Sequence, residues 1–571
     1  MGGDGLLDGG SPYQGLYHLR HRVSIHRSVF AVTGEQLLPW SVLLPVGPQE
    51  LQEFLRERHV TVFASLSTVD ANHHALAVDI SDLQVSQLTG AHPGGVERQK
   101  HHLVFQTPTG SIAGNFVTGA ADKVFGPYTD DTIVTDPMKH ALGITPQFGK
   151  QVANSDMCGS CHNILLPVFN NDGTRHSFTI NGKTIQSTYE QTTHLEWVNS
   201  SFAKQGASFQ SCQDCHMQRH YPGKNGQQKL LTAIKIANNE DSSFAPTTFR
   251  LADKDIALTQ RETFGRHSLH GVNLFLNAMF QQFPLLLGLR QLDYMVTSSA
   301  QPALITGQNS MAQMAQQETA AINITSVERN KEILKATVLV TNKTGHYLPS
   351  GVGFRRAFLE FIAEDKDGKP LWASGRTNEL GVIVDCLTDT PLPAENAAQH
   401  PQSYLPHYQQ ITRGDQAQIY QEVILDSARE VTTSFLRRVD TVKDNRLRPK
   451  GYDPQVFARN PSPYVQELAE LHGVEDDPYY RDPTLTGADE ITYLITLPQE
   501  QLARVSKVRV TLYNQSIPPS YLQQRFSDAI KGPAEKDDIQ RLYYLTSHLH
   551  TTSAIANWKL ALASAEQALT K

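Results

Sequence analysis

Apolar and polar side chains alternate along much of the second half of the chain. The alternation runs through residues 321–327, 335–342, 357–364, 417–425, 492–497 and 506–513. A period of two residues puts the apolar side chains on one face of a strand, and turn-forming residues separate the runs. Several short strands at this spacing predict an Ig-like β-sandwich over residues 318–515.

The part of the chain before these strands has a different pattern. Residues 1–105 mix short strand-like runs with one helical stretch and predict a mixed N-terminal region. Residues 106–315 combine loops rich in Gly, Pro, Asn and Asp with helices, and they predict a loop- and helix-rich module. The expected elements are strands at 60–64 and 76–80 and helices at 49–58, 189–202 and 273–294, the last interrupted near Pro284.

Two further segments complete the pattern. A polar stretch at 434–488, rich in Pro, Asp and Tyr, predicts a long loop inserted in the sandwich and lying on the surface. Residues 520–571 predict C-terminal helices, including an amphipathic helix at 554–570. The chain as a whole is therefore expected to be an α+β multidomain protein.

Composition narrows the class of protein. A length of 571 residues allows two to four domains, and 39% apolar with 19% charged residues is ordinary for a globular chain. The net charge of −7 indicates neither a nucleic acid nor an anionic membrane surface as partner. The sequence has no run of about twenty apolar residues, so it predicts no membrane span.

Two short motifs carry the candidate chemistry. Both 158–162 and 212–216 read C-x-x-C-H, and they contain four of the five cysteines. In a chain of this composition, the chance expectation for such a string is about 0.002 occurrences. The motif is the attachment signature of c-type haem, in which two thiols bond to the vinyl groups and the adjacent histidine ligates the iron. The sequence therefore predicts two covalent haems, bound by Cys158, Cys161, Cys212 and Cys215, with His162 and His216 as proximal ligands.

Other interpretations of the cysteines remain open at this stage. The two C-x-x-C pairs can close a tetrahedral zinc site, or each can form a short-range disulfide. Neither interpretation uses the histidine that follows each second cysteine. The fifth cysteine, Cys386, lies in an apolar run and predicts a buried free thiol.

The haem motifs indicate where in the cell the protein is located. Residues 1–5 lack the basic, apolar and small-residue regions of a signal peptide. Covalent haem attachment nevertheless takes place on the outer side of the bacterial inner membrane. We therefore expect a periplasmic or extracellular protein whose leader is not present in this numbering.

Four segments resemble the multihaem cytochrome c superfamily. They are 125–131 with His140, 193–203 with 211–217, 266–273, and 342–351, which reads NKTGHYLPSG. The resemblance covers residues from about 120 to 360. Relatives often carry a further haem nearer the N-terminus, whereas no cysteine precedes Cys158 here.

The resemblance implies distal iron ligands. Histidines at the positions of His267 and His346 often bind the second face of a haem iron in this superfamily, and His140 and His270 are further candidates. His194 is more simply explained by packing. A ligand on a turn fixed by Gly and Pro is held at low entropic cost, which suits His346.

Three functions follow from these expectations. The first is electron transfer between two bis-histidine haems and a redox partner protein. The second is an enzyme in which one haem keeps an open position for a small nitrogen, sulfur or peroxide substrate. The third is an assembly subunit, as an oligomer or part of an extracellular cytochrome complex. The large mass per haem favours the second somewhat, whereas the available histidines favour the first.

Overall fold

A computed structural model describes part of the chain as two compact units. The described residues are 122–217, 265, 267–289, 303–531, 536–551 and 553–569, together with the backbone of short strands elsewhere. One unit comprises Met1–Gly126 and Thr135–Val152, and the other comprises Pro127–Val134 and Ala153–Lys571. Helices and several small sheets occur together, so the fold is α+β. The expected domain boundaries near 105, 315 and 520 stay predictions.

The first unit is built from short elements. Strand β6 (Lys123–Gly126) pairs in parallel with β7 (Thr145–Phe148), and helix α5 (Asp136–Leu142) precedes β7. The earlier strands are β1 (Phe30–Thr33), β2 (Gln36–Leu37), β3 (Thr61–Phe63), β4 (Ser67–Val69) and β5 (Ala75–Ala77). Strands β3 and β5 overlap the expected strands at 60–64 and 76–80. The helix expected at 49–58 lies outside the described residues.

Two sheets form the largest part of the second unit. One has the order β16-β17-β25-β20, and the other has the order β19-β18-β26-β27 with β21 also on β18. All neighbours are antiparallel except β20 and β25. Each alternating run predicted from the sequence contains or overlaps one or two of these strands. Their bounds are β16 (Ala320–Arg329), β17 (Ile333–Asn342), β18 (Arg356–Glu364), β19 (Pro370–Ser374), β20 (Gln410–Ile411), β21 (Ile419–Tyr420), β25 (Ala488–Thr496), β26 (Lys507–Gln515) and β27 (Leu560–Ala568).

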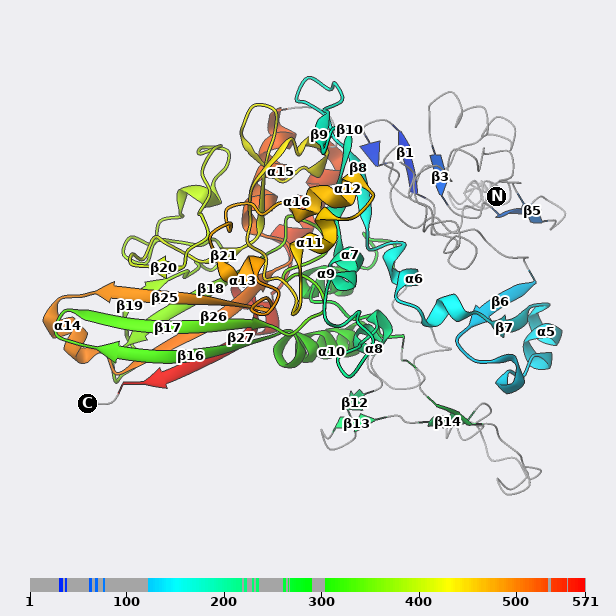
Figure 1. Cartoon of the computed structure of the whole chain (residues 1–571), viewed down its shortest axis with the longest axis horizontal. Helices are drawn as coiled ribbons and strands as arrows, with labels where there is room; N and C mark the ends of the chain where they lie inside the picture. Colours follow the sequence, from blue (N-terminus) through cyan, green and yellow to red (C-terminus); the bar gives the residue numbers. More distant parts are fainter. Residues whose placement is uncertain are drawn as a thin grey trace, which may run out of the picture. The chain divides into compact units, whose positions relative to one another are not determined.

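The two sheets share one apolar core, and Figure 1 shows their strands running side by side as two layers. The ring of Phe361 on β18 stacks on that of Tyr493 on β25, with centroids 4.0 Å apart. Both side chains are fully buried. Burial of each such aromatic side chain contributes roughly 2 to 3 kcal/mol to the free energy of unfolding.

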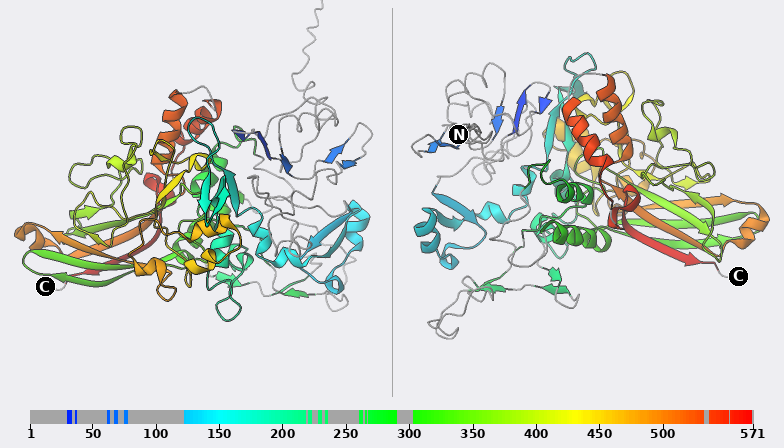
Figure 2. Two further views of the ribbon diagram at one scale, coloured as in Figure 1. Left: turned by 45° about the horizontal axis from the view of Figure 1, so that its top comes forward. Right: turned by 180° about the vertical axis from the view of Figure 1, so that it is seen from behind.

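Helices pack at the ends of the sheets. Helix α9 (Leu274–Gln282) ends before Pro284, as expected, and packs on α10 (Ala303–Glu318). Helix α14 (Gln499–Arg504) joins β25 to β26. Helices α15 (Pro519–Lys531) and α16 (Lys536–Ser547) form a pair, which Figure 2 shows from two further sides.

The prediction of a helix at 554–570 is wrong. Residues up to Trp558 lie in a short 3-10 stretch (Ser553–Trp558), and the rest of the segment forms strand β27, which pairs along its length with β26. Leu560 and Leu562 are buried whereas the intervening Ala561 is not, so the true period is two residues. The exposed edge of β26 provides the backbone partners that select the strand.

The prediction that 434–488 is a surface loop is also wrong. The segment forms strand β24 (Asp440–Asp444), which pairs with β22 (Glu422–Leu425) next to β23 (Val431–Thr432), and helices α11 (Pro454–Ala458), α12 (Pro463–Gln466) and α13 (Pro478–Arg481). Tyr452 and Tyr480 are fully buried. The proline-rich composition arises because each of the three helices begins with Pro, and Asp453 and Asp477 cap two of them.

The two C-x-x-C-H motifs lie in a region of short elements. The helix expected at 189–202 is shorter, because strand β11 occupies its first residues and pairs with β8. The elements are α6 (Asp156–Gly159), β8 (Ile164–Pro167), β9 (Phe178–Ile180), β10 (Lys183–Ile185), β11 (Ser187–Gln191), α7 (Thr193–Val198) and α8 (Cys212–His216). Short strands β12 (His220–Pro222), β13 (Gln228–Leu230), β14 (Ala233–Lys235) and β15 (Gln260–Glu262) follow.

Candidate functional site

The two C-x-x-C-H motifs lie directly against each other. The backbone N–H of Cys212 donates to the Ser155 hydroxyl at 3.0 Å, and the Gln213 amide donates to the Asn154 carbonyl at 2.9 Å. The thiols of Cys158 and Cys212 are hydrogen-bond partners. This contact is the largest cause that raises the pKa of Cys158, and burial is the second largest. Helices α6 and α8 therefore present both attachment motifs at one place, although 50 residues separate them in the sequence.

The four motif cysteines do not form a tetrahedral metal site. Among the described residues, His407, Asp477 and Asp489 alone have three or more ligand atoms mutually within 4.8 Å. In a tetrahedral thiolate site with bonds of about 2.3 Å, all sulfurs lie roughly 3.8 Å from one another. The cysteines are also unpaired by disulfides. This geometry argues against a tetrahedral zinc site at the four motif cysteines.

The turn that carries His346 begins at the end of β17. The Asn342 side chain donates to the carbonyls of His346 at 2.8 Å and Leu447 at 3.0 Å, and its oxygen accepts from the Thr344 N–H. Gly345 packs closely on α7, since a Cβ there would lie 3.0 Å from Trp197. The absence of a side chain at this position is what allows the turn to approach the motif region.

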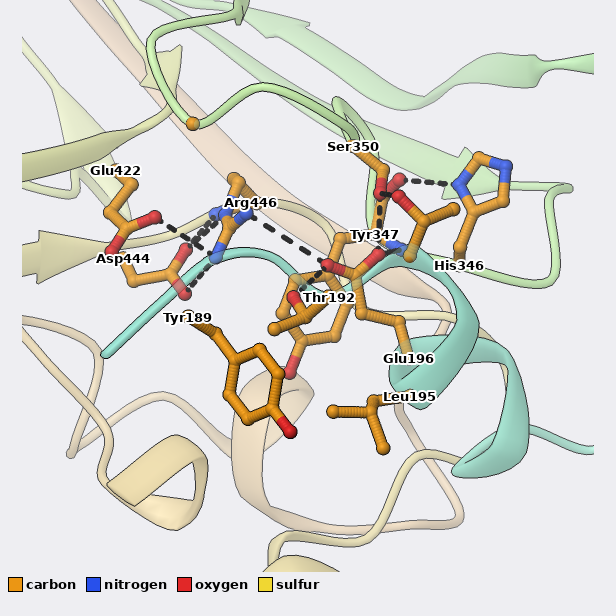
Figure 3. A network of polar contacts seen from close by, with 12 residues as sticks. Tyr189, Thr192, Leu195, Glu196, His346, Tyr347, Ser350, Glu422, Asp444 and Arg446 are labelled. Atoms are coloured by element: carbon orange, nitrogen blue, oxygen red, sulfur yellow. Dashed lines mark hydrogen bonds and ion pairs between the residues drawn. The ribbon is translucent and has the colours of Figure 1, made fainter. Parts of the chain in front are cut away.

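Glu196 on α7 anchors the same turn. Its carboxylate, which is almost fully buried, accepts from the Tyr347 N–H at 3.0 Å and from the Ser350 hydroxyl at 2.6 Å. Thr192 donates to its other oxygen at 2.6 Å, and Arg446 lies 3.9 Å away (Figure 3). The buried charge is thus satisfied by several donors, which makes the position of the turn specific.

An apolar contact adds to these polar ones. Tyr347, the residue after His346, is buried in a small core with Leu165, Tyr189 and Tyr452. The guanidinium of Arg448 lies over its ring, 4.1 Å from the centroid. The turn is held on both sides of His346, so the imidazole has little freedom to move.

The rings of His216 and His346 face each other at a distance that suits one metal ion. Their centroids are 6.3 Å apart and their planes differ by 15°. Two imidazoles on opposite sides of one ion, with metal–nitrogen bonds of about 2 Å, have centroids roughly 6 Å apart. Nδ1 of His216 contacts the His270 carbonyl at 2.6 Å, and Nδ1 of His346 contacts the Tyr347 carbonyl at 2.9 Å. These contacts protonate Nδ1 and leave the Nε2 lone pair of each ring for a metal.

His162 lies in the same group of imidazoles. Burial lowers the pKa of His162, and the next contributions come from the neighbouring rings of His216 and His346. The His162 carbonyl accepts from the His194 N–H at 3.1 Å. The structure therefore brings together three of the five histidines predicted to bind iron.

The remaining predicted histidines are placed differently. The side chain of His267 is exposed. The next residue, Ser268, donates a hydrogen bond to the His216 carbonyl at 3.2 Å. His140 is an exposed residue of α5, in the other compact unit. His270 contributes its backbone carbonyl to His216.

His194 supports the first motif by packing. Its Nδ1 is 3.3 Å from the Asn163 amide and its Nε2 is 3.2 Å from the Asp156 carboxylate. A Cβ at Gly159 would lie 2.6 Å from the ring, so the ring rests directly on the backbone of the motif. Nδ1 is hydrogen-bonded, whereas the contact of Nε2 with Asp156 lacks hydrogen-bond geometry, so the ring is placed by packing and by its Nδ1 contact.

Sequence reasoning missed Glu196 and Arg355. Glu196 stands between Leu195 and Trp197 in an apolar helix, and a lone carboxylate in such a stretch is a usable signal for a buried polar contact. Arg355 carries no comparable signal, because it lies between the turn with His346 and strand β18, where an arginine is ordinary. Its guanidinium donates to the Ser350 carbonyl at 3.0 Å, so it also contacts the turn.

A second cluster of potential ligands is a structural hydrogen-bond network. His407 contacts Asp477 at 2.9 Å through Nε2, while Nδ1 accepts from the side-chain amides of Gln418 and Asn445. The orientations of both amides are fixed, because their oxygens accept backbone N–H groups. Nδ1 is therefore unprotonated and Nε2 carries the proton, so His407 offers no lone pair to a metal at the carboxylates of Asp477 and Asp489.

Among the described residues, no helix is both long enough and apolar enough to cross a membrane.

Comparisons with known proteins give one match. No protein-family model matches the chain, and no curated protein matches it. A solved structure described as a penta-heme cytochrome c552 from Thermochromatium tepidum aligns with 98% of this chain and 91% of its own, at 13% identity and a TM-score of 0.38. A score at this level assigns neither a shared fold nor a function.

Proposed function

We propose that this chain is a dihaem c-type cytochrome that transfers electrons with a redox partner protein in the periplasm or outside the cell. One haem is bound through Cys158 and Cys161 and the other through Cys212 and Cys215. His162 and His216 are the proximal ligands. The bound haems supply reversible one-electron chemistry.

The observation that carries this proposal is the pairing of His216 with His346. Their spacing of 6.3 Å and nearly parallel planes suit two ligands of one iron, and His216 belongs to a C-x-x-C-H motif. Carbonyl contacts at both Nδ1 atoms orient the rings. Two strong-field nitrogen ligands leave no open position, which favours an electron carrier over a catalyst at this haem.

The two sheets have a place in this function. We propose that they form an Ig-like β-sandwich whose strand β17 delivers the turn with His346 to the motif region. Glu196 and the buried Tyr347 hold that turn at fixed distance from α7. A rigid pair of axial ligands keeps the reorganisation energy of electron transfer low, because neither ring has to move when the charge changes.

For the haem at His162, the predicted distal candidate in the same compact unit is His267. The alternative function, an enzyme with one open-site haem, applies to this haem. The cationic side chain of Arg355 near His162 favours that alternative, since it can bind a small anion there. Carbon monoxide binding to the reduced protein distinguishes the two: little reaction supports the carrier, and stoichiometric binding to one haem supports the enzyme.

The first experiment is the intact mass of the purified protein. We expect the polypeptide mass plus two haem groups, retained after extraction with acidified acetone. Replacing both cysteines of one motif, as in Cys212→Ser with Cys215→Ser, should remove one haem and leave the other. Haem that is lost on extraction, or a stoichiometric zinc ion in its place, would contradict the proposal.

The second experiment tests the axial pair. His346→Ala should convert one haem from low-spin to high-spin or water-ligated, and added imidazole should restore the low-spin spectrum. His194→Gln is the matched control, because it removes a buried imidazole of the same region that is not among the residues proposed to bind iron. Two unchanged low-spin haems in His346→Ala would show that this histidine is only a turn residue.

A further inference from the structure

The guanidinium of Arg355 differs from those of the buried arginines of the second unit. Arg356 binds the Glu395 carboxylate at 2.9 Å, Arg438 binds Glu467 at 2.6 Å, and both Arg446 and Arg448 bind Asp444. Each therefore has an anion within hydrogen-bond distance. Among the described residues, Arg355 has no carboxylate within ion-pair distance, and its Nε is buried without a partner.

Glu190 and Arg355 influence each other electrostatically, but the two side chains form no ion pair. Glu190 accepts from the Gly353 N–H at 3.1 Å, and burial raises its pKa to about 7. A carboxyl group with this pKa is about half ionised at neutral pH, so it offsets the charge of Arg355 only in part. The Arg355 side chain is half-buried and its Nε is buried without a partner, so the position suits an anion from outside the described chain.

The chain also makes room for the guanidinium. Gly351 has a positive φ of 90°, and a Cβ there would lie 2.4 Å from Nη1 of Arg355. Nη1 donates to the Ser350 carbonyl, and the Ser350 side chain is bound to Glu196. Arg355 is therefore fixed to the same turn as His346, and its charge acts on both His346 and His162.

We infer that Arg355 binds an anionic oxygen group beside the imidazole cluster, either the carboxylate of a haem propionate or a small free oxyanion. This inference rests on the proposed haem function. The planar fork of a guanidinium matches the two oxygens of a carboxylate, and Lys provides the charge without the fork. Arg355 is thus a positioning residue for the cofactor in the first case and a binding residue for an exogenous anion in the second.

Redox titration of the full-length haem-loaded protein tests the inference. Wild type, Arg355→Gln and Arg355→Lys are titrated without added anions and then with sodium formate, a planar carboxylate, and sodium sulfate. A nearby positive charge disfavours the oxidised haem, which carries one more positive charge than the reduced haem. Removing that charge in Arg355→Gln should therefore stabilise the oxidised state and lower one midpoint potential. We expect at least a tenfold change in the ratio of reduced to oxidised haem at fixed potential, which for one electron is 59 mV. Arg355→Lys should retain most of the wild-type potential.

The anion series separates the two sources. If the ligand is a propionate, the Arg355→Gln shift appears in anion-free buffer and neither formate nor sulfate changes the wild-type spectrum. If it is a free oxyanion, formate or sulfate shifts the wild-type spectrum or potential with saturation, and Arg355→Gln abolishes that response. Arg413→Gln, which removes an exposed arginine paired with Asp415, is the control and should change nothing.

The inference fails if Arg355→Gln keeps the wild-type midpoint potentials with and without the anions. If thermal unfolding shows that Arg355→Gln is misfolded, Arg355→Met takes its place, and the inference fails if the folded Arg355→Met protein keeps the wild-type midpoint potentials and the wild-type anion response. A protein that carries no covalent haem by mass contradicts the proposed function itself, and that measurement is independent of Arg355. The two failures are therefore distinguishable.

Discussion

The two-sheet region, made of β16–β21 and β25–β27, and the motif region, residues 154–217, differ in what they bury. In the two-sheet region most buried side chains are apolar, and those of β17 and β25 alternate with less buried ones, although β18 is buried at every position and Arg356 and Gln515 are buried polar residues. In the motif region many buried residues are polar, and apolar side chains near the motifs are exposed. The buried polar residues include Ser155, Ser160, Asn163, Thr192, His194, Glu196, Asn199 and Ser200, and the exposed apolar residues include Met157, Val198 and Phe209.

The difference shows which kind of order each region needs. Apolar burial contributes to the free energy of unfolding, and because it is non-directional it tolerates repacking. Hydrogen bonds to buried groups are directional, and they fix the orientation of His216 and His346. Substitutions in the first region should therefore change the free energy of unfolding, whereas those in the second should also change the haem spectrum.

The largest expected effect is on stability. Phe361→Ala removes a fully buried ring that stacks on Tyr493, and should lower the free energy of unfolding by about 3 to 5 kcal/mol. Urea unfolding followed by tryptophan fluorescence measures this loss, while the visible spectrum below the transition should match wild type. A loss below about 1 kcal/mol would mean that this core repacks around the cavity.

Glu196→Ala should have a smaller effect on stability and a clear one on the spectrum. It leaves the Tyr347 N–H and the Ser350 hydroxyl without their acceptor, at a cost of about 2 to 4 kcal/mol. The freed turn should weaken ligation by His346, seen as a partial high-spin signal. Glu490→Ala, at an exposed position of β25, is the control. A wild-type spectrum in Glu196→Ala would separate the anchoring of the turn from iron ligation.

Glu190 should make stability depend on pH. Burial raises its pKa from 4.5 to about 7, so between these values the folded state binds more protons than the unfolded state. The contribution of Glu190 to the free energy of unfolding is therefore fully present below pH 4.5 and is lost as the pH rises towards 7. Glu190→Gln should remove about 1 to 3 kcal/mol of that pH dependence. Urea midpoints at pH 5 and pH 7.5 measure it, and equal pH dependence in variant and wild type would contradict the assignment.

The smallest effect is expected at an exposed ion pair of the second unit, outside both regions. Arg413→Gln breaks a pair with Asp415 at 2.9 Å in which both side chains are solvent-exposed, and should change the free energy of unfolding by no more than about 0.5 kcal/mol. The same urea experiment checks it. A larger loss would show that charge contacts matter for stability outside the motif region as well.

The sequence by itself determined the strands and the attachment motifs. The alternating runs located β16, β17, β18, β25 and β26. On β17 and β25 the buried side chains follow a period of two residues, whereas β18 is buried along its whole length. The C-x-x-C-H strings and the Gly-His turn are equally local, since their chemistry depends on neighbours in the chain.

Only the tertiary structure decided where local patterns are ambiguous. Most of the segment 554–570 became strand β27 because β26 offers a free edge, and short apolar runs do not choose between helix and strand alone. The stretch 434–488 became packed helices because its Asp-Pro steps start helices as well as turns.

The candidate site shows the same division. His216 and His346 are 130 residues apart in the sequence, and nothing local relates their rings. Glu196 holds the turn and Arg355 lies beside it because α7 and the end of β17 meet in space. The sequence supplied the candidate histidines. Contacts between distant segments decided which of them lie opposite each other, because the energy of such contacts depends on both segments and cannot be inferred from either one alone.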